Sequence, residues 1–314
     1  MNTVKTWASE IKAVLNNTFF GNEDLYNLLF VPLLCEGHIL IDDVPGVGKS
    51  LLARTLAGAL GGTFSQIACT PDLLPSDILG VSIYDEAKNG FLFRKGPIMA
   101  NIVLVDEINR ATPRTQSALL EAIAEGQISV EGKSLPLPEP FFLIATESPL
   151  DQEGTFPLPE VQKDRFFLTM KIGYPEQETE RKIMKSHDPE KKKKEISQDF
   201  SSLLNCREEI LKVHVAPQLR HYILQVVNKT RNDSRLIFGV SPRGSLAIYK
   251  GAQAMAALND REYVTPEDIK TVIYPVLNKR IHIHPEWKLK GVTEELFIDE
   301  ILSEIPVPLT SETD

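Results

Sequence analysis

Hydrophobic residues along the first half of the chain follow two alternating patterns. Val4, Trp7, Ile11 and Leu15 are spaced as on one face of an amphipathic helix, and a second helix is predicted over residues 23–35. Short apolar runs, each of a length typical of a buried strand, then alternate with helical stretches such as 50–60 and 115–124; they cover residues 38–41, 64–68, 102–105, 141–145 and 167–172. Strands that alternate with helices predict an α/β fold in which a parallel sheet has helices on both faces.

Two segments interrupt this alternation, and each is predicted to form a β-hairpin. Residues 81–93 contain a strand around Tyr84 that turns and returns, and residues 127–137 turn at 131–133. The residues alone leave two readings open, because such hairpins serve equally as surface decoration or as contacts to a partner.

Strand patterns nearly vanish after residue 174, and helices dominate the rest of the chain. Thr265, Pro266 and Asp268 form a helix start with an N-cap, a first-turn proline and an acidic residue. The lysine-rich residues 186–197 are predicted to form a solvated loop. Further helices are predicted over residues 176–185, 217–230, 241–258, 265–277 and 293–304. The length of 314 residues suits two domains, an α/β domain over residues 1–174 and a small all-helical domain over residues 175–314.

Composition and charge exclude several classes of protein. The 34 Lys and Arg residues against 43 Asp and Glu give a net charge of −9, which opposes binding to nucleic acid and anionic membranes. Cys35, Cys69 and Cys206 lie far apart with no CxxC motif, so neither a disulfide framework nor a zinc site is indicated. No signal peptide or bilayer-spanning run is recognisable. We therefore expect a soluble, cytoplasmic protein with no nucleic-acid partner.

The predicted strand at residues 38–41 leads into a glycine-rich loop that a helix follows at once. A phosphate-binding loop needs glycines that let backbone N–H groups approach, a lysine for the β- and γ-phosphates, and a hydroxyl ligand for Mg²⁺. Asp43 stands where the GxxxxGK[ST] pattern has glycine, and we expect the loop to tolerate it because this position precedes the phosphate cradle. The predicted nucleotide-binding residues are Asp43, Val44, Pro45, Gly46, Val47, Gly48, Lys49, Ser50 and Leu51.

Two adjacent carboxylates follow the apolar run at residues 102–105. Beside a phosphate loop, Asp106 is suited to bind Mg²⁺ together with Ser50, and Glu107 to polarise an attacking water. The pair is weak evidence alone, but together with the glycine-rich loop it predicts a site for nucleotide hydrolysis.

The sequences of the motifs and their order along the chain closely resemble those of the MoxR group of AAA+ ATPases. The matching stretches lie at residues 44–50, 70–80, 93–98, 105–122, 153–166 and 240–244, and the likeness runs from about residue 20 to residue 277. The resemblance implies a three-layer αβα ATPase domain, a helical lid, ATP and Mg²⁺ as ligands, and rings, usually hexameric, that remodel protein clients. It also implies a von Willebrand A-type partner protein, and it likens the first hairpin to the helix-2 insert and the second to the hairpin before sensor 1.

The resemblance also assigns roles to individual residues. Arg165 resembles the arginine finger offered to a neighbouring subunit, Arg243 the sensor-2 residue of the lid, and Phe20 and Gly21 the segment that contacts the base. Lys49 and Ser50 then belong to the Walker A motif, and Asp106 and Glu107 to Walker B.

The sensor-1 region departs from the family pattern. Family members usually read Ala-Thr-Gln-Asn-Pro here, whereas residues 145–149 read Ala-Thr-Glu-Ser-Pro and place Ser148 at the sensor with Glu147 beside it. A hydroxyl orients water but reaches less far than an amide and has fewer donors. We therefore expect hydrolysis that is slow or dependent on a partner.

Three functions are compatible with these features. The first is an ATP-driven, chaperone-like machine for protein clients, with metal or cofactor insertion as one form of that role. The second is a nucleic-acid motor or loader, which the acidic composition disfavours because Lys88 and Lys133 are the only basic residues at the predicted hairpin tips. The third is a nucleotide-sensing scaffold with little turnover.

Overall fold

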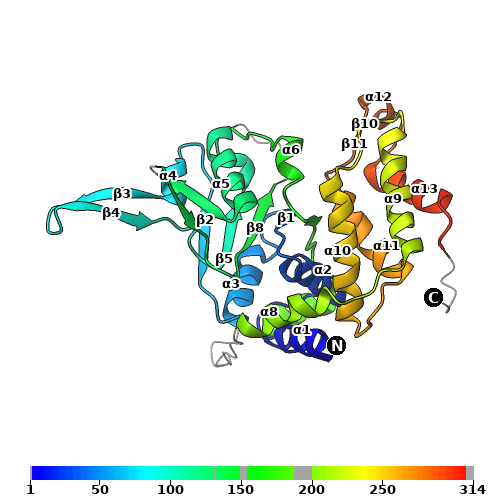
Figure 1. The fold of residues 1–314 in the computed structure, drawn as a ribbon, viewed down its shortest axis with the longest axis horizontal. Coiled ribbons are helices and arrows are strands. Elements are labelled where there is room, and N and C mark those ends of the chain that lie inside the picture. The colour runs from blue at the N-terminus through cyan, green and yellow to red at the C-terminus, as the bar shows by residue number, and fades with distance from the viewer. Residues whose placement is uncertain (1, 131, 149–153, 187–199, 309–314) are drawn as a thin grey trace.

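The computed structural model describes residues 2–130, 132–148, 154–186 and 200–308 (Figure 1). Within these residues a sheet domain and a group of lid helices lie side by side, and one hairpin projects away from the body (Figure 1). The loop predicted over residues 186–197 lies, after Ser186, outside the described residues.

A parallel five-stranded sheet forms the centre of the first part of the chain, in the order β2-β5-β8-β1-β9. Its strands are β1 (Ile39–Asp42), β2 (Phe64–Ala68), β5 (Ile102–Asp106), β8 (Phe142–Glu147) and β9 (Leu168–Met170). The predicted strands are all present, although β9 is shorter than expected. Because β5, β8 and β1 are neighbours, the segments that leave their carboxyl ends meet at one edge of the sheet.

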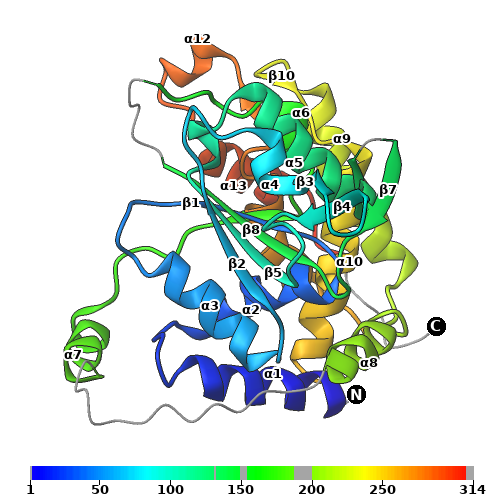
Figure 2. The same cartoon turned by 90° about the vertical axis from the view of Figure 1, so that its left-hand side faces the viewer.

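Helices cover both faces of this sheet, as the alternating pattern predicted (Figure 2). In β5, Ile102 and Leu104 pack into the core beneath α1 (Asn2–Leu15), α2 (Glu23–Leu34) and α3 (Lys49–Ala59). Val103 and Val105 face the opposite core, formed with α4 (Pro75–Leu79) and α5 (Pro113–Glu125). Successive side chains of a strand point to opposite faces, so one apolar strand supplies two cores and produces the αβα layers.

Both predicted hairpins are present. The first pairs β3 (Gly80–Asp85) with β4 (Gly90–Lys95) and extends away from the sheet (Figure 1). The second pairs β6 (Gln127–Val130) with β7 (Lys133–Pro136), and its Ile128 is buried in the same core as α5. The second hairpin is therefore packed on the domain, whereas the first exposes large apolar side chains.

The described chain after β9 is predominantly helical. It contains α7 (Gln177–Ser186), α8 (Phe200–Ile210), α9 (Pro217–Asn232), α10 (Pro242–Leu258), α11 (Pro266–Leu277), α12 (Pro285–Lys288) and α13 (Glu294–Glu304). At the start of α11 the Asp268 carboxylate accepts the Thr265 N–H at 2.8 Å, as the capping pattern predicted. The structure adds α8 and α12 to the predicted helices, together with a short antiparallel pair, β10 (Leu236–Phe238) and β11 (His282–Ile283).

The lid shares its hydrophobic core with one face of the sheet domain. Helix α10 packs on α1 and α2, and Cys206 of α8 is buried in the cluster that also contains Trp7 of α1. No helix in the described part of the chain has both the length and the continuous apolar sequence of a bilayer span.

Candidate functional site

The loop between β1 and α3 exposes backbone to a ligand. Gly46 and Gly48 have φ angles of 88° and 91°, left-handed values that glycine adopts without strain. Gly48 is the N-cap of α3, and no side chain among the described residues caps this helix end. The first N–H groups of α3 therefore point outward without a side-chain acceptor, which favours an anion.

A cavity of about 290 Å³ lies over this loop, opposite the ends of β5 and β8. It is lined by Pro45, Gly46, Gly48, Lys49, Ser50, Leu51, Asp106, Glu107 and Ser148. The structure thus brings together three separate segments that the sequence predicted as one site. The adjacent carboxyl ends of the strands explain this, because each segment follows its own strand.

The Lys49 ammonium group is held by the loop that carries it. Its Nζ donates to the backbone oxygens of Asp43 at 2.9 Å and Val44 at 3.1 Å. The Ser50 hydroxyl oxygen accepts from the Gln66 amide at 3.4 Å, which is a long contact. Both polar groups lie in the wall of the cavity.

Asp43 supports the loop from behind. One carboxylate oxygen accepts the N–H of Val44 at 2.8 Å, and the other accepts the N–H groups of Ile172 and Gly173, both at 2.7 Å. The side chain thereby ties the start of the loop to the chain that leaves β9. This contact explains how an aspartate replaces the glycine of the usual pattern.

Thr146 of β8 organises the two carboxylate residues that follow β5. Its buried hydroxyl donates to Asp106 Oδ1 at 2.7 Å and accepts the N–H of Glu107 at 2.8 Å. Glu107 has a left-handed backbone with φ of 54°, and its carboxylate pairs with Arg110 at 2.8 Å in the short 3-10 helix η1 (Ile108–Arg110). The sequence did not indicate Thr146 or Arg110 as partners of these carboxylate residues, although Thr146 lies in the sensor-1 stretch and Arg110 in the family-like stretch 105–122.

The two sensor-1 residues have different environments. Ser148 lines the cavity, whereas Glu147 is buried and burial raises the pKa of its carboxyl group. Glu147 Oε2 has no hydrogen-bond partner among the described residues. Nearby, Asp42 pairs with Lys279 of the lid at 2.9 Å; burial opposes the charge of Lys279, but this carboxylate outweighs it and raises the lysine pKa.

A second cavity of about 520 Å³ adjoins the first through Gly46, Gly48 and Leu51, which line both. The predicted base-contacting residues Phe20 and Gly21 line it, and so do Thr18, Phe19, Asn22, Leu25, Val47, Ile172, Gly173, Tyr174, Pro175, Glu176, Thr179 and Ile183. A largely apolar cavity next to a phosphate loop has the shape and chemistry for the base of a nucleotide.

The two predicted catalytic arginines lie elsewhere. Arg165 Nη1 donates to the backbone oxygen of Leu120 in α5 at 2.6 Å. Arg243, in the first turn of α10, has its Nη1 3.6 Å from Asp164 Oδ2. Within this chain, the structure does not bring either side chain into the cavity walls.

The donor set around the loop fits Mg²⁺ bound with phosphate. The described residues contain no cluster of three or more His, Cys, Asp or Glu side chains that could hold a metal alone. Mg²⁺ usually binds through one or two carboxylates together with substrate phosphates. Asp106 and Ser50 lie in one cavity wall and supply suitable oxygens.

Comparison with known proteins gives consistent matches. Residues 38–168 match the ATPase family associated with various cellular activities (AAA), and residues 228–301 match the AAA lid domain. The protein YeaC of Bacillus subtilis, described as uncharacterized, is 45% identical over 300 residues, covering 94% of this chain and 93% of that protein. Chaperone MoxR1 of Mycobacterium tuberculosis is 37% identical, covering 98% and 83%.

A solved structure matches over nearly the whole length. A crystal structure of a protein from Cytophaga hutchinsonii has a TM-score of 0.89 and 35% sequence identity, and the match covers 98% of each chain. The arrangement of sheet domain and lid is therefore common to both proteins.

Proposed function

This chain belongs to the MoxR family of AAA+ ATPases, and on that premise we propose that it binds ATP with Mg²⁺ and hydrolyses it to ADP and phosphate. The observation that carries the proposal is the single cavity that gathers Lys49, Ser50, Asp106 and Glu107. Lys49 and Ser50 begin the helix that follows β1, whereas Asp106 ends β5 and Glu107 comes directly after it. Their types match the groups that phosphoryl transfer needs.

Each side chain has a role that its position suits. Lys49 exchanges the carbonyls of its own loop for the β- and γ-phosphates, while the N–H groups at the start of α3 bind phosphate oxygens. Ser50 and Asp106 would hold Mg²⁺, which when bound neutralises phosphate charge. Once the Glu107 carboxylate leaves Arg110, it orients and polarises the attacking water. Ser148, which lines the same cavity, contributes a hydroxyl group.

Completion of the site requires the two arginines. We propose that Arg243 closes the lid onto the γ-phosphate and that Arg165 acts on the nucleotide of a neighbouring subunit. Such assembly implies a ring, for which six subunits is the family expectation. The proposed division into an ATPase domain, residues 1–174, and a lid, residues 175–314, places the two arginines on opposite sides of the boundary.

We propose a protein client as the target of this ATPase. A relative named as a chaperone supports this direction. The projecting first hairpin supports it too, since Tyr84 and Phe91 are exposed and pack edge to face with ring centroids 5.5 Å apart. An exposed aromatic hairpin on a chain of net charge −9 suits contact with a protein better than contact with a nucleic-acid backbone. A von Willebrand A-type partner protein stays part of this proposal.

Two variants test the division of roles inside the cavity. Lys49→Ala should abolish ATP binding, because the lysine contacts phosphates in the ground state. Glu107→Gln should keep ATP affinity and block phosphate release, because the carboxylate acts on water in the transition state. Titration calorimetry and a steady-state phosphate assay measure the two quantities.

The same assays discriminate the alternatives. Equal loss of ATP affinity in both variants would contradict the roles assigned here. Tight ATP binding without phosphate release by the assembled wild type would favour the nucleotide-sensing scaffold. Micromolar DNA binding with a steep salt dependence would favour the nucleic-acid motor.

A further inference from the structure

A buried arginine of the lid binds the segment that carries Arg165. Arg280 follows α11, and its side chain is only 4% exposed. Its Nε donates to Asp164 Oδ1 at 2.8 Å, and Nη1 donates to the backbone oxygens of Phe167 at 2.9 Å and Val276 at 2.6 Å. Nη2 donates to the backbone oxygens of Asp164 and Phe166. Every N–H of the guanidinium group is therefore used, and most hold the chain on either side of Arg165.

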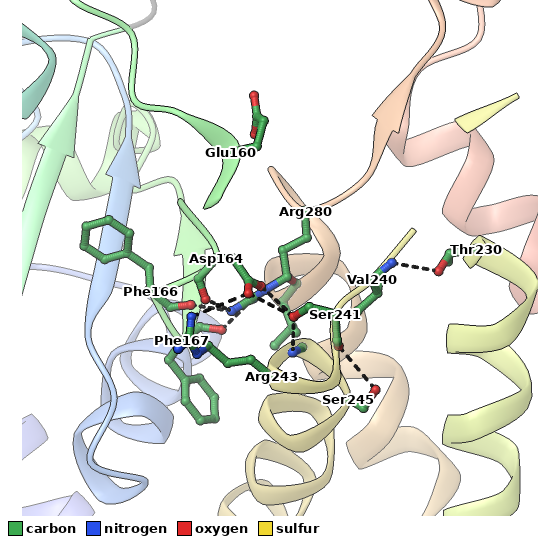
Figure 3. A network of polar contacts seen from close by, with 12 residues as sticks. Glu160, Asp164, Phe166, Phe167, Thr230, Val240, Ser241, Arg243, Ser245 and Arg280 are labelled. Carbon is green, nitrogen blue, oxygen red and sulfur yellow. Dashed lines mark hydrogen bonds and ion pairs between the residues drawn. The ribbon is translucent and has the colours of Figure 1, made fainter. Parts of the chain in front are cut away.

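Asp164 is the shared acceptor of this network. It caps the C-terminus of α6 (Glu160–Lys163), and both of its carboxylate oxygens lie within 3.0 Å of the Ser241 hydroxyl group at the start of α10. Figure 3 shows Arg280, Ser241 and Arg243 pointing toward it. One carboxylate thus joins α6, α10 and the end of α11.

The two arginines that face Asp164 are held very differently. Arg280 is buried and hydrogen-bonded, whereas Arg243 is 56% exposed and its Nη1 lies 3.6 Å from Asp164 Oδ2. The Arg243 contact is an ion pair without hydrogen-bond geometry, so it is much easier to exchange. Arg243 can leave Asp164 while Arg280 stays in place.

We propose that Asp164 and Arg280 are positioning residues that couple the nucleotide of one subunit to the arginine finger it offers to the next. Asp164 competes with bound nucleotide for Arg243, and through Arg280 the same carboxylate fixes the backbone around Arg165. This inference rests on the proposed ATPase function and on the roles of Arg165 and Arg243 in it.

The coupling follows from charge balance at Asp164. When Arg243 moves to a γ-phosphate, Asp164 loses one of its two cationic neighbours. Arg280 and the Ser241 hydroxyl group then remain to stabilise the negative charge of its carboxylate. The neighbouring Lys279 pairs with Asp42 at the end of β1, so this corner of the lid contacts both the strand that leads into the phosphate loop and the finger segment. A change in one contact therefore acts directly on the support of Arg165.

The first test is a double-mutant cycle on binding of the non-hydrolysable analogue AMP-PNP, measured by titration calorimetry. Asp164→Asn should bind the analogue roughly two- to fivefold more tightly than wild type, the size expected for freeing an arginine from an exposed ion pair. In an Arg243→Gln background, Asp164→Asn should change nothing. Unchanged affinity in Asp164→Asn, or the same gain in both backgrounds, would overturn the competition.

The second test measures the finger in mixed rings. Subunits with Glu107→Gln do not turn over but still offer Arg165, so they are added in excess to wild type. Adding Arg280→Lys or Asp164→Asn to these donors should lower phosphate release by wild-type neighbours roughly ten- to a hundredfold, as expected for a misplaced catalytic group. The positioning role would be overturned if Glu107→Gln subunits supported the same turnover with and without Arg280→Lys or Asp164→Asn.

Arg280→Lys keeps the charge beside Asp164 and loses the planar fork, so its AMP-PNP affinity should stay at the wild-type value while its donor function falls. It also tests the proposal should Asp164→Asn fail to fold, which a thermal melt reveals. Asp268→Asn is the matched control, because it removes an arginine-paired carboxylate at the other end of α11. Donors with this change should support neighbours fully.

Loss of the proposed hydrolysis and loss of the proposed coupling give different experimental results. Wild type that binds AMP-PNP but releases no phosphate would refute the proposed hydrolysis, while the binding cycle would still decide whether Asp164 competes for Arg243. The coupling alone would be refuted if the wild type hydrolysed ATP, Asp164→Asn had the same effect on AMP-PNP affinity with and without Arg243→Gln, and mixed rings kept full turnover.

Discussion

The phosphate cavity and the junction between lid and sheet domain hold the charged residues of the proposed reaction in opposite ways. In the cavity, Lys49, Asp106 and Glu107 already line one space. At the junction, Arg165 and Arg243 are each bound to groups outside that space. The fold of a single chain therefore assembles the nucleotide-binding residues, whereas the two arginines that complete catalysis have to be released from their contacts or supplied by a neighbouring subunit.

The strengths of the contacts are consistent with this division. An exposed pair such as Arg243 with Asp164 contributes about 1 kcal/mol or less, so the binding of a phosphate can replace it. Breaking a buried pair such as Arg280 with Asp164 by removing one partner costs roughly 3–5 kcal/mol. The junction therefore combines a fixed contact with an exchangeable one.

The largest effect is expected from removal of Arg165, the arginine proposed to be supplied to a neighbouring subunit. Arg165→Ala should bind ATP nearly normally but lose turnover by about 10³ to 10⁵, the contribution of an arginine finger in related phosphoryl transfer. Phosphate release per chain should also rise with protein concentration in the wild type, because assembly supplies the missing arginine.

Mixing provides the control for Arg165. Rings that combine Arg165→Ala with Glu107→Gln should regain part of the activity, because some interfaces then pair an intact Glu107 with an intact neighbouring arginine. Concentration-independent turnover, or no recovery in mixed rings confirmed by native mass spectrometry, would count against a shared site.

Acid should destabilise the sheet that positions the residues of the phosphate cavity. Burial lowers the pKa of His38, before β1, from 6.5 to about 4, and its Nδ1 accepts the N–H of Leu143 at 3.3 Å. Between these pH values the unfolded chain binds the proton and the folded chain does not. Stability is therefore present above about pH 6.5 and is lost as pH falls toward 4, by up to roughly 3 kcal/mol.

Urea unfolding at a series of pH values measures this effect. His38→Gln should flatten the dependence between pH 4 and 6.5, since its amide oxygen can still accept the Leu143 N–H without titrating. His221→Gln, on the exposed side of α9, is the matched control and should keep the wild-type slope. A His38→Gln slope equal to that of wild type would rule out this histidine as the source.

A smaller effect is expected from the hydroxyl that organises the carboxylates. Thr146→Val replaces the buried hydroxyl that accepts the partly buried Glu107 N–H, which costs about 1–3 kcal/mol and should lower kcat/KM roughly ten- to a hundredfold. Thr146→Ser keeps the hydroxyl and should retain most of the activity. Equal losses in the two variants would show that packing of the methyl group, not the hydroxyl, supports the site.

The cavity half could be predicted from the sequence because its residues follow strands directly. Once β1, β5 and β8 were recognised as short apolar runs, the parallel sheet required Ser50, Asp106 and Ser148 to meet at one edge. Local chemistry within each segment then identified the site without knowledge of the tertiary structure.

The junction could not be predicted in this way. Asp164 and Arg280 are far apart in sequence. Asp164 belongs to the family-like stretch 153–166, but nothing in that stretch indicates its partner, and Arg280 stands in no motif. Their pairing depends on how the lid packs on the sheet domain, which no local periodicity encodes. The strands β10 and β11 were missed for a related reason, because runs of three and two residues are too short to show alternation.

The smallest expected effect lies at the sensor, where the cavity half departs from its family. Ser148→Asn should raise the basal ATPase rate roughly two- to tenfold, because an amide reaches further and offers water both a donor and an acceptor. Ser148→Ala should lower it. Glu147 is buried and, unlike Ser148, does not line the cavity, so we do not expect it to replace the missing amide. If the steady-state rate of Ser148→Asn does not rise, single-turnover kinetics show why. An unchanged single-turnover rate means that the serine is already suited to this site. A rise seen only in a single turnover means that product release limits the steady state.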